Sequence, residues 1–170
     1  MEAELQNKSD NYIQLKKDVN TIRFGIRDEN GNDTGNFLEF NLTRVDLLEK
    51  YQRMLEEDKK NRTDANNKLI ILSKKQDHKG KKLLSYKEEE EIRIKREFMQ
   101  KEVQIYNMFL GENGVEKILN GRELTWFTLN EIDEIIEKVI YPKLEISAKN
   151  IKNEIMSKYS SKDKKDDVIE

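Results

Sequence analysis

The oxygen-bearing side chains between residues 28 and 39 have the spacing of a calcium-binding loop. Positions one, three, five, seven and twelve of that spacing are held by Asp28, Asn30, Asn32, Thr34 and Glu39. Position six, which needs a glycine, is Asp33, and the flanking residues alternate in polarity as strands do, whereas the calcium motif requires helices. We therefore expect a solvated turn here and no metal site.

His78 is the single histidine of the chain, and base catalysis or metal ligation would have to involve it. The chain has no cysteine, and no second histidine can share a metal with His78. It has no obvious serine partner, and the chain contains no glycine-rich phosphate loop ending in Lys-Ser or Lys-Thr. The sequence thus predicts no catalytic residue, no cofactor, no metal ligand and no enzymatic activity.

Charged residues are abundant but balanced. With 32 basic and 34 acidic residues the net charge is −2, so no global field attracts nucleic acid or an anionic membrane. The lysines of residues 74–82 could contact phosphates, but no aromatic residue interleaves with them and acidic residues 88–91 follow. The longest apolar run, residues 69–72, is far too short for a membrane span. We expect a soluble, cytoplasmic protein that binds neither nucleic acid nor membrane.

A β-hairpin is predicted over residues 21–42, because apolar residues alternate with polar ones on both sides of a turn-rich segment. The residues that share its apolar face are Ile22, Phe24, Ile26, Leu38, Phe40 and Leu42. Residues 1–18 are expected to form a tail or lead-in.

Two long helices are expected next, at about 44–75 and 85–110. Thr43 is a candidate cap for the first, whose charged middle allows either one helix with a solvent-exposed centre or two helices broken near residues 61–63. Ser85 and Glu88 have capping-box spacing at the start of the second. The two helices should pair antiparallel and project as a helical hairpin joined by the lysine-rich loop.

A short helix at 114–119 and a long one at about 128–159 complete the expected domain, 19–160, and residues 161–170 are expected to be a disordered charged tail. Thr128 with Glu131 has the spacing of a second capping box, and Pro142 should kink or divide the helix. The predicted fold class is α+β, mainly α, with the β-hairpin packed on a bundle of long helices.

Aromatic and apolar residues gather around the 111–121 break between these helices. The candidates for a protein-binding groove are Tyr106, Phe109, Leu110, Trp126 and Phe127. The alternative is that all five are ordinary core residues, as clustered aromatics often are.

The layout resembles the small tail-assembly chaperones of long-tailed bacteriophages of low-GC bacteria. The resembling segments are the hairpin, the charged helix after it, residues 105–121 and the terminal helix. The resemblance implies a helical, non-enzymatic protein in the bacterial host cell that binds the tape-measure protein, keeps it soluble until the tail tube forms, and oligomerises along it.

Two other functions fit the composition. The first is a phage-encoded, anti-CRISPR-like inhibitor of a host defence nuclease, with the acidic residues 56–58 and 88–91 occluding a nucleic-acid channel. The second is a helical scaffold protein that associates with itself. Salt-sensitive binding to a basic nuclease favours the inhibitor, whereas co-purification with a long helical phage protein favours the chaperone.

Overall fold

The computed structural model describes residues 20–42 and 46–160. It is mainly α-helical with one two-stranded antiparallel sheet, as the sequence predicts. In chain order the elements are β1 (Thr21–Arg27), β2 (Asp33–Asn41), α1 (Asp46–Ser73), α2 (Tyr86–Leu110), α3 (Gly114–Leu119), α4 (Trp126–Ile135), the π-helical turn η1 (Ile136–Ile140) and α5 (Tyr141–Ser160). The expected lead-in, the Thr43 cap and the tail from 161 to 170 lie outside the described residues.

The β-hairpin is confirmed. Phe24 pairs with Leu38 and Ile22 with Phe40, so the apolar side chains of both strands share one face. Leu38 and Phe40 are buried against the helices. In the turn, the carboxylate of Asp28 accepts the backbone N–H groups of Asn30 at 2.9 Å and Asn32 at 2.8 Å.

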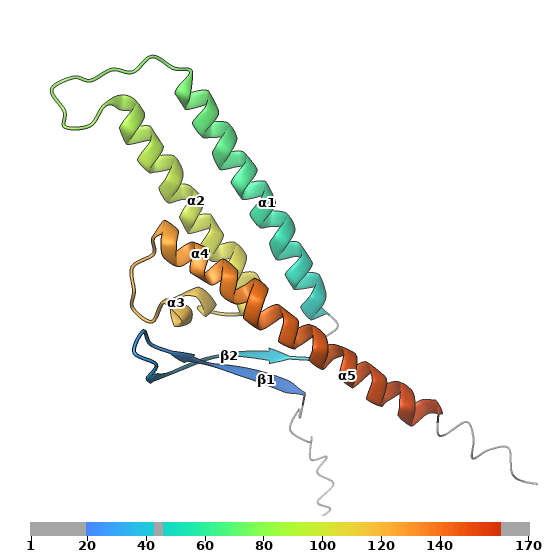
Figure 1. The fold of residues 1–170 in the computed structure, drawn as a ribbon. Coiled ribbons are helices and arrows are strands. Elements are labelled where there is room, and N and C mark those ends of the chain that lie inside the picture. The colour runs from blue at the N-terminus through green and yellow to red at the C-terminus, as the bar shows by residue number, and fades with distance from the viewer. Residues whose placement is uncertain (1–19, 43–45, 161–170) are drawn as a thin grey trace, which may run out of the picture.

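Helices α1 and α2 pair antiparallel and project beyond the sheet as an arm (Figure 1). Of the two forms that the sequence allowed for α1, the structure has the single continuous helix. The capping box at the start of α2 is present, because Ser85 Oγ accepts the N–H of Glu88 and Glu88 Oε2 accepts the N–H of Ser85. The lysine-rich segment is the loop at the tip of the arm.

The capping prediction for the last long helix is wrong. The helix begins at Trp126, two residues earlier than expected, and Thr125 is its cap. The Thr125 N–H donates to Thr128 Oγ1 at 2.8 Å, and the Thr128 N–H donates to Thr125 Oγ1 at 3.2 Å. Thr128 is therefore the reciprocal partner in the box and not its first residue, and Glu131 pairs with Arg122 instead.

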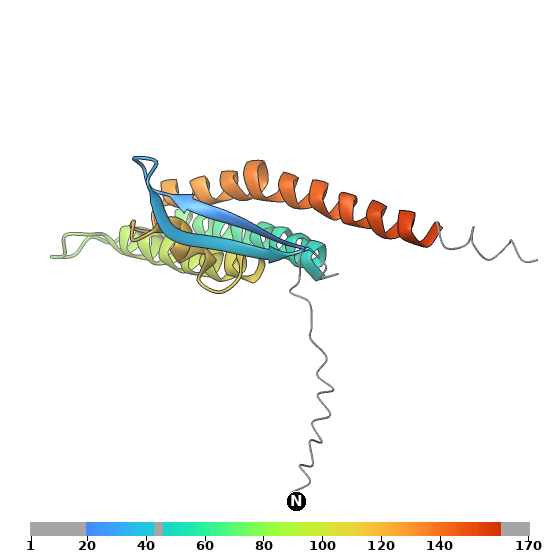
Figure 2. The same ribbon diagram turned by 90° about the horizontal axis from the view of Figure 1, so that it is seen from below.

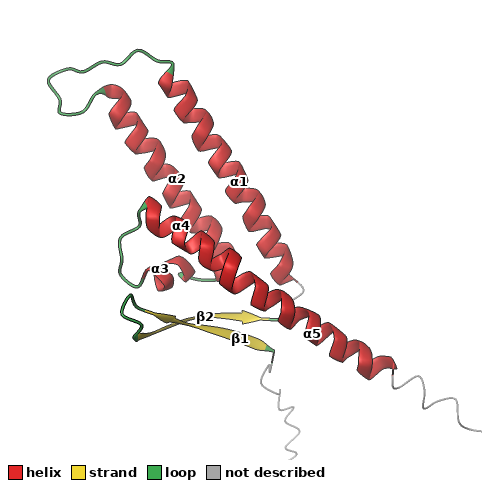
Figure 3. Ribbon diagram, viewed as in Figure 1, coloured by secondary structure: helices red, strands yellow, loops and turns green. Residues whose placement is uncertain are grey.

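Pro142 does interrupt the regular α-helical hydrogen bonds, but it does not divide the helix. The N–H of Tyr141 bonds to the carbonyl of Ile136, one residue further back than in an α-helix. The π-helical turn ends two residues before Pro142, which has no backbone N–H to donate, and α4, η1 and α5 follow one another as a continuous helical rod (Figure 3).

The rod lies against one side of the α1–α2 pair, and the sheet packs at the base of the arm, away from the loop at the tip (Figure 2). The core gathers residues from both strands and from all of the helices except the outer part of the arm. Its fully buried side chains include Tyr106, Met54, Leu129, Ile132, Ile136, Ile140, Leu144 and Val115. The base of the arm is thereby fixed in the core.

Candidate protein-binding groove

The structure separates the five residues that the sequence suggested for a binding groove. Tyr106, Phe109 and Leu110 are buried, with 0%, 4% and 3% of their surfaces exposed. Trp126 is 49% exposed and Phe127 is 84% exposed. The five therefore form neither one groove nor one core.

Tyr106, Phe109 and Leu110 are core because they lie on the face of α2 that the rest of the fold covers. The ring of Phe109 lies 5.4 Å from that of Phe40 on β2 and 5.1 Å from that of Tyr51 on α1. No partner can reach these side chains in the folded protein. Of the five residues, Trp126 and Phe127 remain available for contact.

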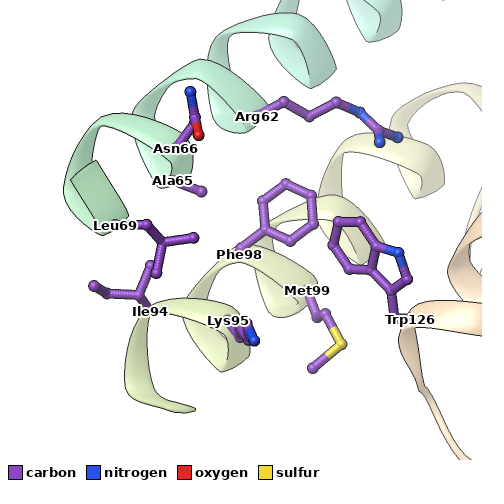
Figure 4. A pocket seen from close by; sticks show the side chains of 9 residues that line it. All are labelled: Arg62, Ala65, Asn66, Leu69, Ile94, Lys95, Phe98, Met99 and Trp126. Carbon is purple, nitrogen blue, oxygen red and sulfur yellow. The ribbon is translucent and has the colours of Figure 1, made fainter. Parts of the chain in front are cut away.

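A different apolar groove lies between α1 and α2, on the side of the arm that α4 partly covers (Figure 4). Its volume is about 520 Å³. The side chains that line it are Arg62, Ala65, Asn66, Leu69, Ile94, Lys95, Phe98, Met99 and Trp126. Trp126, the single tryptophan of the chain, closes one end, with its ring 5.5 Å from the ring of Phe98.

The opposite side of the same helix pair is charged. Lys68 of α1 pairs with Glu97 of α2 at 3.3 Å across the seam, and Lys101 and Asp64 stand nearby. Ala65, Ile94 and Phe98 lie in the seam and contribute to both sides. The arm therefore has one mainly apolar side and one mainly charged side.

A polar cluster closes the inner end of the groove. The side-chain amide of Asn61 donates to Glu102 Oε1 at 2.7 Å and to the Phe98 carbonyl at 3.2 Å. Asn61 and Glu102 are 5% and 0% exposed. The charged middle of α1, which the sequence suggested would face solvent, thus contains a residue that anchors α1 to α2.

Arg62 joins three elements in this cluster. Its guanidinium group binds Asp58 at 2.6 Å and Asp133 of α4 at 2.8 Å, and it donates to the Tyr106 hydroxyl at 3.1 Å. The Tyr106 hydroxyl in turn donates to Asp133 at 3.0 Å. Burial opposes the charge of Arg62, but the hydrogen bond and the charge of Asp58 raise its pKa overall, so the guanidinium stays charged.

The environment of the Glu102 carboxyl group raises its pKa and so favours its protonated form. Burial, the largest cause, raises its pKa to about 8, and the neighbouring Asp58 carboxyl adds to the shift. Oε2 of Glu102 is buried, and among the residues that the structure describes no donor group bonds to it. The effect of Asp58 on the pKa of Glu102 is that of two neighbouring carboxyl groups, which are disfavoured when both are ionised.

The other sequence candidates form no chemical site. In the turn, hydrogen bonds from the side chain and then the backbone of Asn32 lower the pKa of Asp28, and Glu39 bonds to Arg23 on the neighbouring strand. His78 is exposed in the loop at the tip of the arm. Within residues 20–42 and 46–160 no three His, Asp or Glu side chains are placed to hold a metal ion.

Of the residues that line the groove, the sequence predicted only Trp126, because the others lie on α1 and α2, whose relative alignment the sequence pattern does not give. The sequence also did not predict the contact between Asn61 and Glu102, because an asparagine within a charged stretch gives no sign that it is buried. The spacing of Asp58 and Arg62, one helical turn apart, is the one local hint of this cluster.

No protein-family model matches the chain, and no characterised protein or solved structure shows significant similarity to it. In the described part of the chain, none of the helices has the length and apolar character needed to cross a membrane. The function must therefore be argued from the groove itself.

Proposed function

We propose that this chain is a non-enzymatic protein that binds another protein, and that it acts as a tail-assembly chaperone of a long-tailed phage in the host cytoplasm. Its partner is the tape-measure protein, which it holds soluble until the tail tube forms. The observation that carries the proposal is the apolar groove between α1 and α2, with the half-exposed Trp126 at its end. Grooves of this kind receive amphipathic helices of other proteins.

The surroundings of the groove suit a chaperone. A protein that holds an apolar partner in solution needs a polar exterior around its binding surface. Charged residues make up 39% of the chain, and ion pairs such as Lys68–Glu97 cover the other side of the arm. The resemblance of the sequence to tail-assembly chaperones supports the same function, because it implies a mainly helical binding protein.

Inhibition of a nuclease receives less support. An inhibitor that mimics nucleic acid needs acidic groups that are free to meet a basic channel. Each of Glu89, Glu90 and Glu91 lies within 3.1 Å of a lysine or arginine of the same chain. The acidic run is therefore interleaved with basic side chains on an exposed surface of mixed charge, which leaves the groove as the more distinctive surface.

The test is co-expression with the product of the neighbouring gene, which the proposed function predicts to be a long helical protein. We expect the soluble fraction of that protein to rise and the two proteins to co-purify. Leu69→Gln, which places an amide in the groove, should reduce both effects, because apolar contact drives the binding. Ile71→Gln is the matched control, since Ile71 is two residues away, is 60% exposed, and lies on the charged side.

Circular dichroism of both variants checks that the fold is intact. A partner that is equally soluble with and without this chain contradicts the chaperone function. Equal loss of binding in Leu69→Gln and Ile71→Gln contradicts the groove as the binding site.

A further inference from the structure

The lining of the groove selects for charge as well as for apolar surface. Six of its nine side chains are apolar, two are the cations Arg62 and Lys95, and none is a carboxylate. Lys95 is 56% exposed and pairs with Glu91 on its own helix. Such exposed pairs within one helix are weak, so the lysine can turn to a new anion at little cost.

On the same side of the arm, closer to the core, α4 shows which kind of helix packs against this surface. There α4 covers the arm with Leu129 and Ile132, both buried, and its Asp133 binds Arg62. From Trp126 to Glu137 the chain has four acidic residues and no lysine or arginine. An acidic, amphipathic helix therefore packs against this side of the arm. The N-terminal end of α4, at Trp126, lies at the edge of the groove, and the groove itself is not covered by α4.

The groove has room for a short stretch of one helix. The α1 residues that line it run from Arg62 to Leu69, a rise of about 10 Å at 1.5 Å per residue, which corresponds to two helical turns. Two antiparallel helices present a furrow between their ridges, and a third helix packs into such a furrow.

We infer that the occupant of the groove is a single amphipathic helix of the partner protein, with Asp or Glu residues flanking its apolar stripe. The inference rests on the proposed function in taking the groove as the binding site, and it adds the chemistry of the partner segment. The occupant continues the cover that α4 begins. Its apolar stripe lies on Leu69, Phe98 and Met99, and its carboxylates meet Lys95, because Arg62 is already bound by Asp58 and Asp133.

Three synthetic peptides of about 18 residues, a length at which isolated helices become stable, test this. The first has an apolar stripe flanked by glutamates, the second has lysines in place of the glutamates, and the third is the first with a central proline. None contains tryptophan, so the emission of Trp126 reports on the groove of the full-length protein. We expect the glutamate peptide to shift this emission to shorter wavelength and to bind about tenfold more tightly than the lysine peptide at low salt.

The proline peptide should cause no shift, because it cannot form the continuous helix that the groove requires. Lys95→Glu should abolish the preference for the glutamate peptide. Lys101→Glu makes the same change of charge on the same helix but on the charged side, and should leave the preference intact. Circular dichroism of both variants verifies folding.

Three results of the peptide experiments overturn the inference. The lysine peptide binds as well as the glutamate peptide, the proline peptide binds as well as its parent, or Lys95→Glu and Lys101→Glu behave alike. A second copy of the chain as occupant also overturns it, and would appear as a shift in Trp126 emission with rising concentration of the protein alone.

The peptide experiment tests the chemistry of the occupant and the co-expression experiment tests the chaperone function, so that the two proposals can fail independently. If the glutamate peptide binds in the groove but the long helical neighbour stays insoluble, the inference stands and the chaperone function fails. If the neighbour is solubilised while the peptides show no selectivity, the function stands and the acidic helix is wrong.

Discussion

Replacing Glu102 with glutamine should remove a pH dependence of folding stability that the wild-type protein shows between about pH 5 and pH 7.5. In the folded protein burial raises the pKa of Glu102 to about 8, from an ordinary value of 4.5. Between these two values the folded protein holds a proton that the unfolded chain releases. The stability that this proton provides is complete below the unfolded pKa and is lost as pH rises through the folded pKa.

The expected size follows from the linkage. One proton taken up on folding changes the free energy of unfolding by about 1.4 kcal/mol per pH unit, so stability should fall by up to about 3 kcal/mol over two units. The groups that face Glu102 are Asp58, Asn61 and Arg62 from α1, and Tyr106 beside it on α2. Glutamine keeps the acceptor for Asn61 and offers an N–H to Asp58, but it cannot titrate.

Urea unfolding at pH 5.5, 6.5 and 7.5, followed by circular dichroism, measures the effect. We expect the wild-type protein to lose stability at each step and Glu102→Gln to stay nearly level. Hydrogen bonds lower the pKa values of Asp28, Asp77 and Glu90, so their contributions are lost only as pH falls below about 4 and do not enter this range. Parallel stability curves for the two proteins would show that Glu102 is ionised in the fold, and would refute the raised pKa.

Phe109→Ala should lower the free energy of unfolding by about 3–5 kcal/mol, because it empties a core site; a loss below about 1 kcal/mol in urea unfolding would contradict that placement. Gly114→Ala should cost about 1–3 kcal/mol, because the added methyl group overlaps Cβ of Leu110, and an unchanged melting temperature would show that α3 moves freely. Ser85→Ala should cost about 1 kcal/mol through loss of the α2 cap, measured in the same assay; no loss would mean that the cap is redundant.

The elements that the sequence predicted well are the ones that local rules determine. The alternation of Ile22, Phe24, Leu38 and Phe40 sets the hairpin, and the Ser85 cap sets the start of α2. The start of α4 was misplaced because Thr125 and Thr128 both have capping side chains, and Glu131 made the later one look complete. The spacing of residues along the chain cannot decide which of two overlapping capping boxes begins the helix.

The candidate site could not be predicted in the same way. Phe109 and Trp126 are both aromatic residues beside a break, but the packing of β2 and α1 buries the first, while α4 leaves the second at its exposed end. Which residues of α1 and α2 share a side depends on how the two helices are rotated against each other. One of the contacts that depend on this rotation is the buried hydrogen bond between Asn61 and Glu102, which joins residues 41 positions apart.

The central claim is that the partner protein covers the groove at Trp126. Labelling the single tryptophan with fluorine gives one fluorine resonance that a partner cannot obscure. In the purified complex with the long helical partner, we predict that this resonance shifts and that Trp126, 49% exposed in the free protein, becomes protected from a soluble paramagnetic quencher. A stable complex in which the resonance and its quenching are unchanged would contradict the claim.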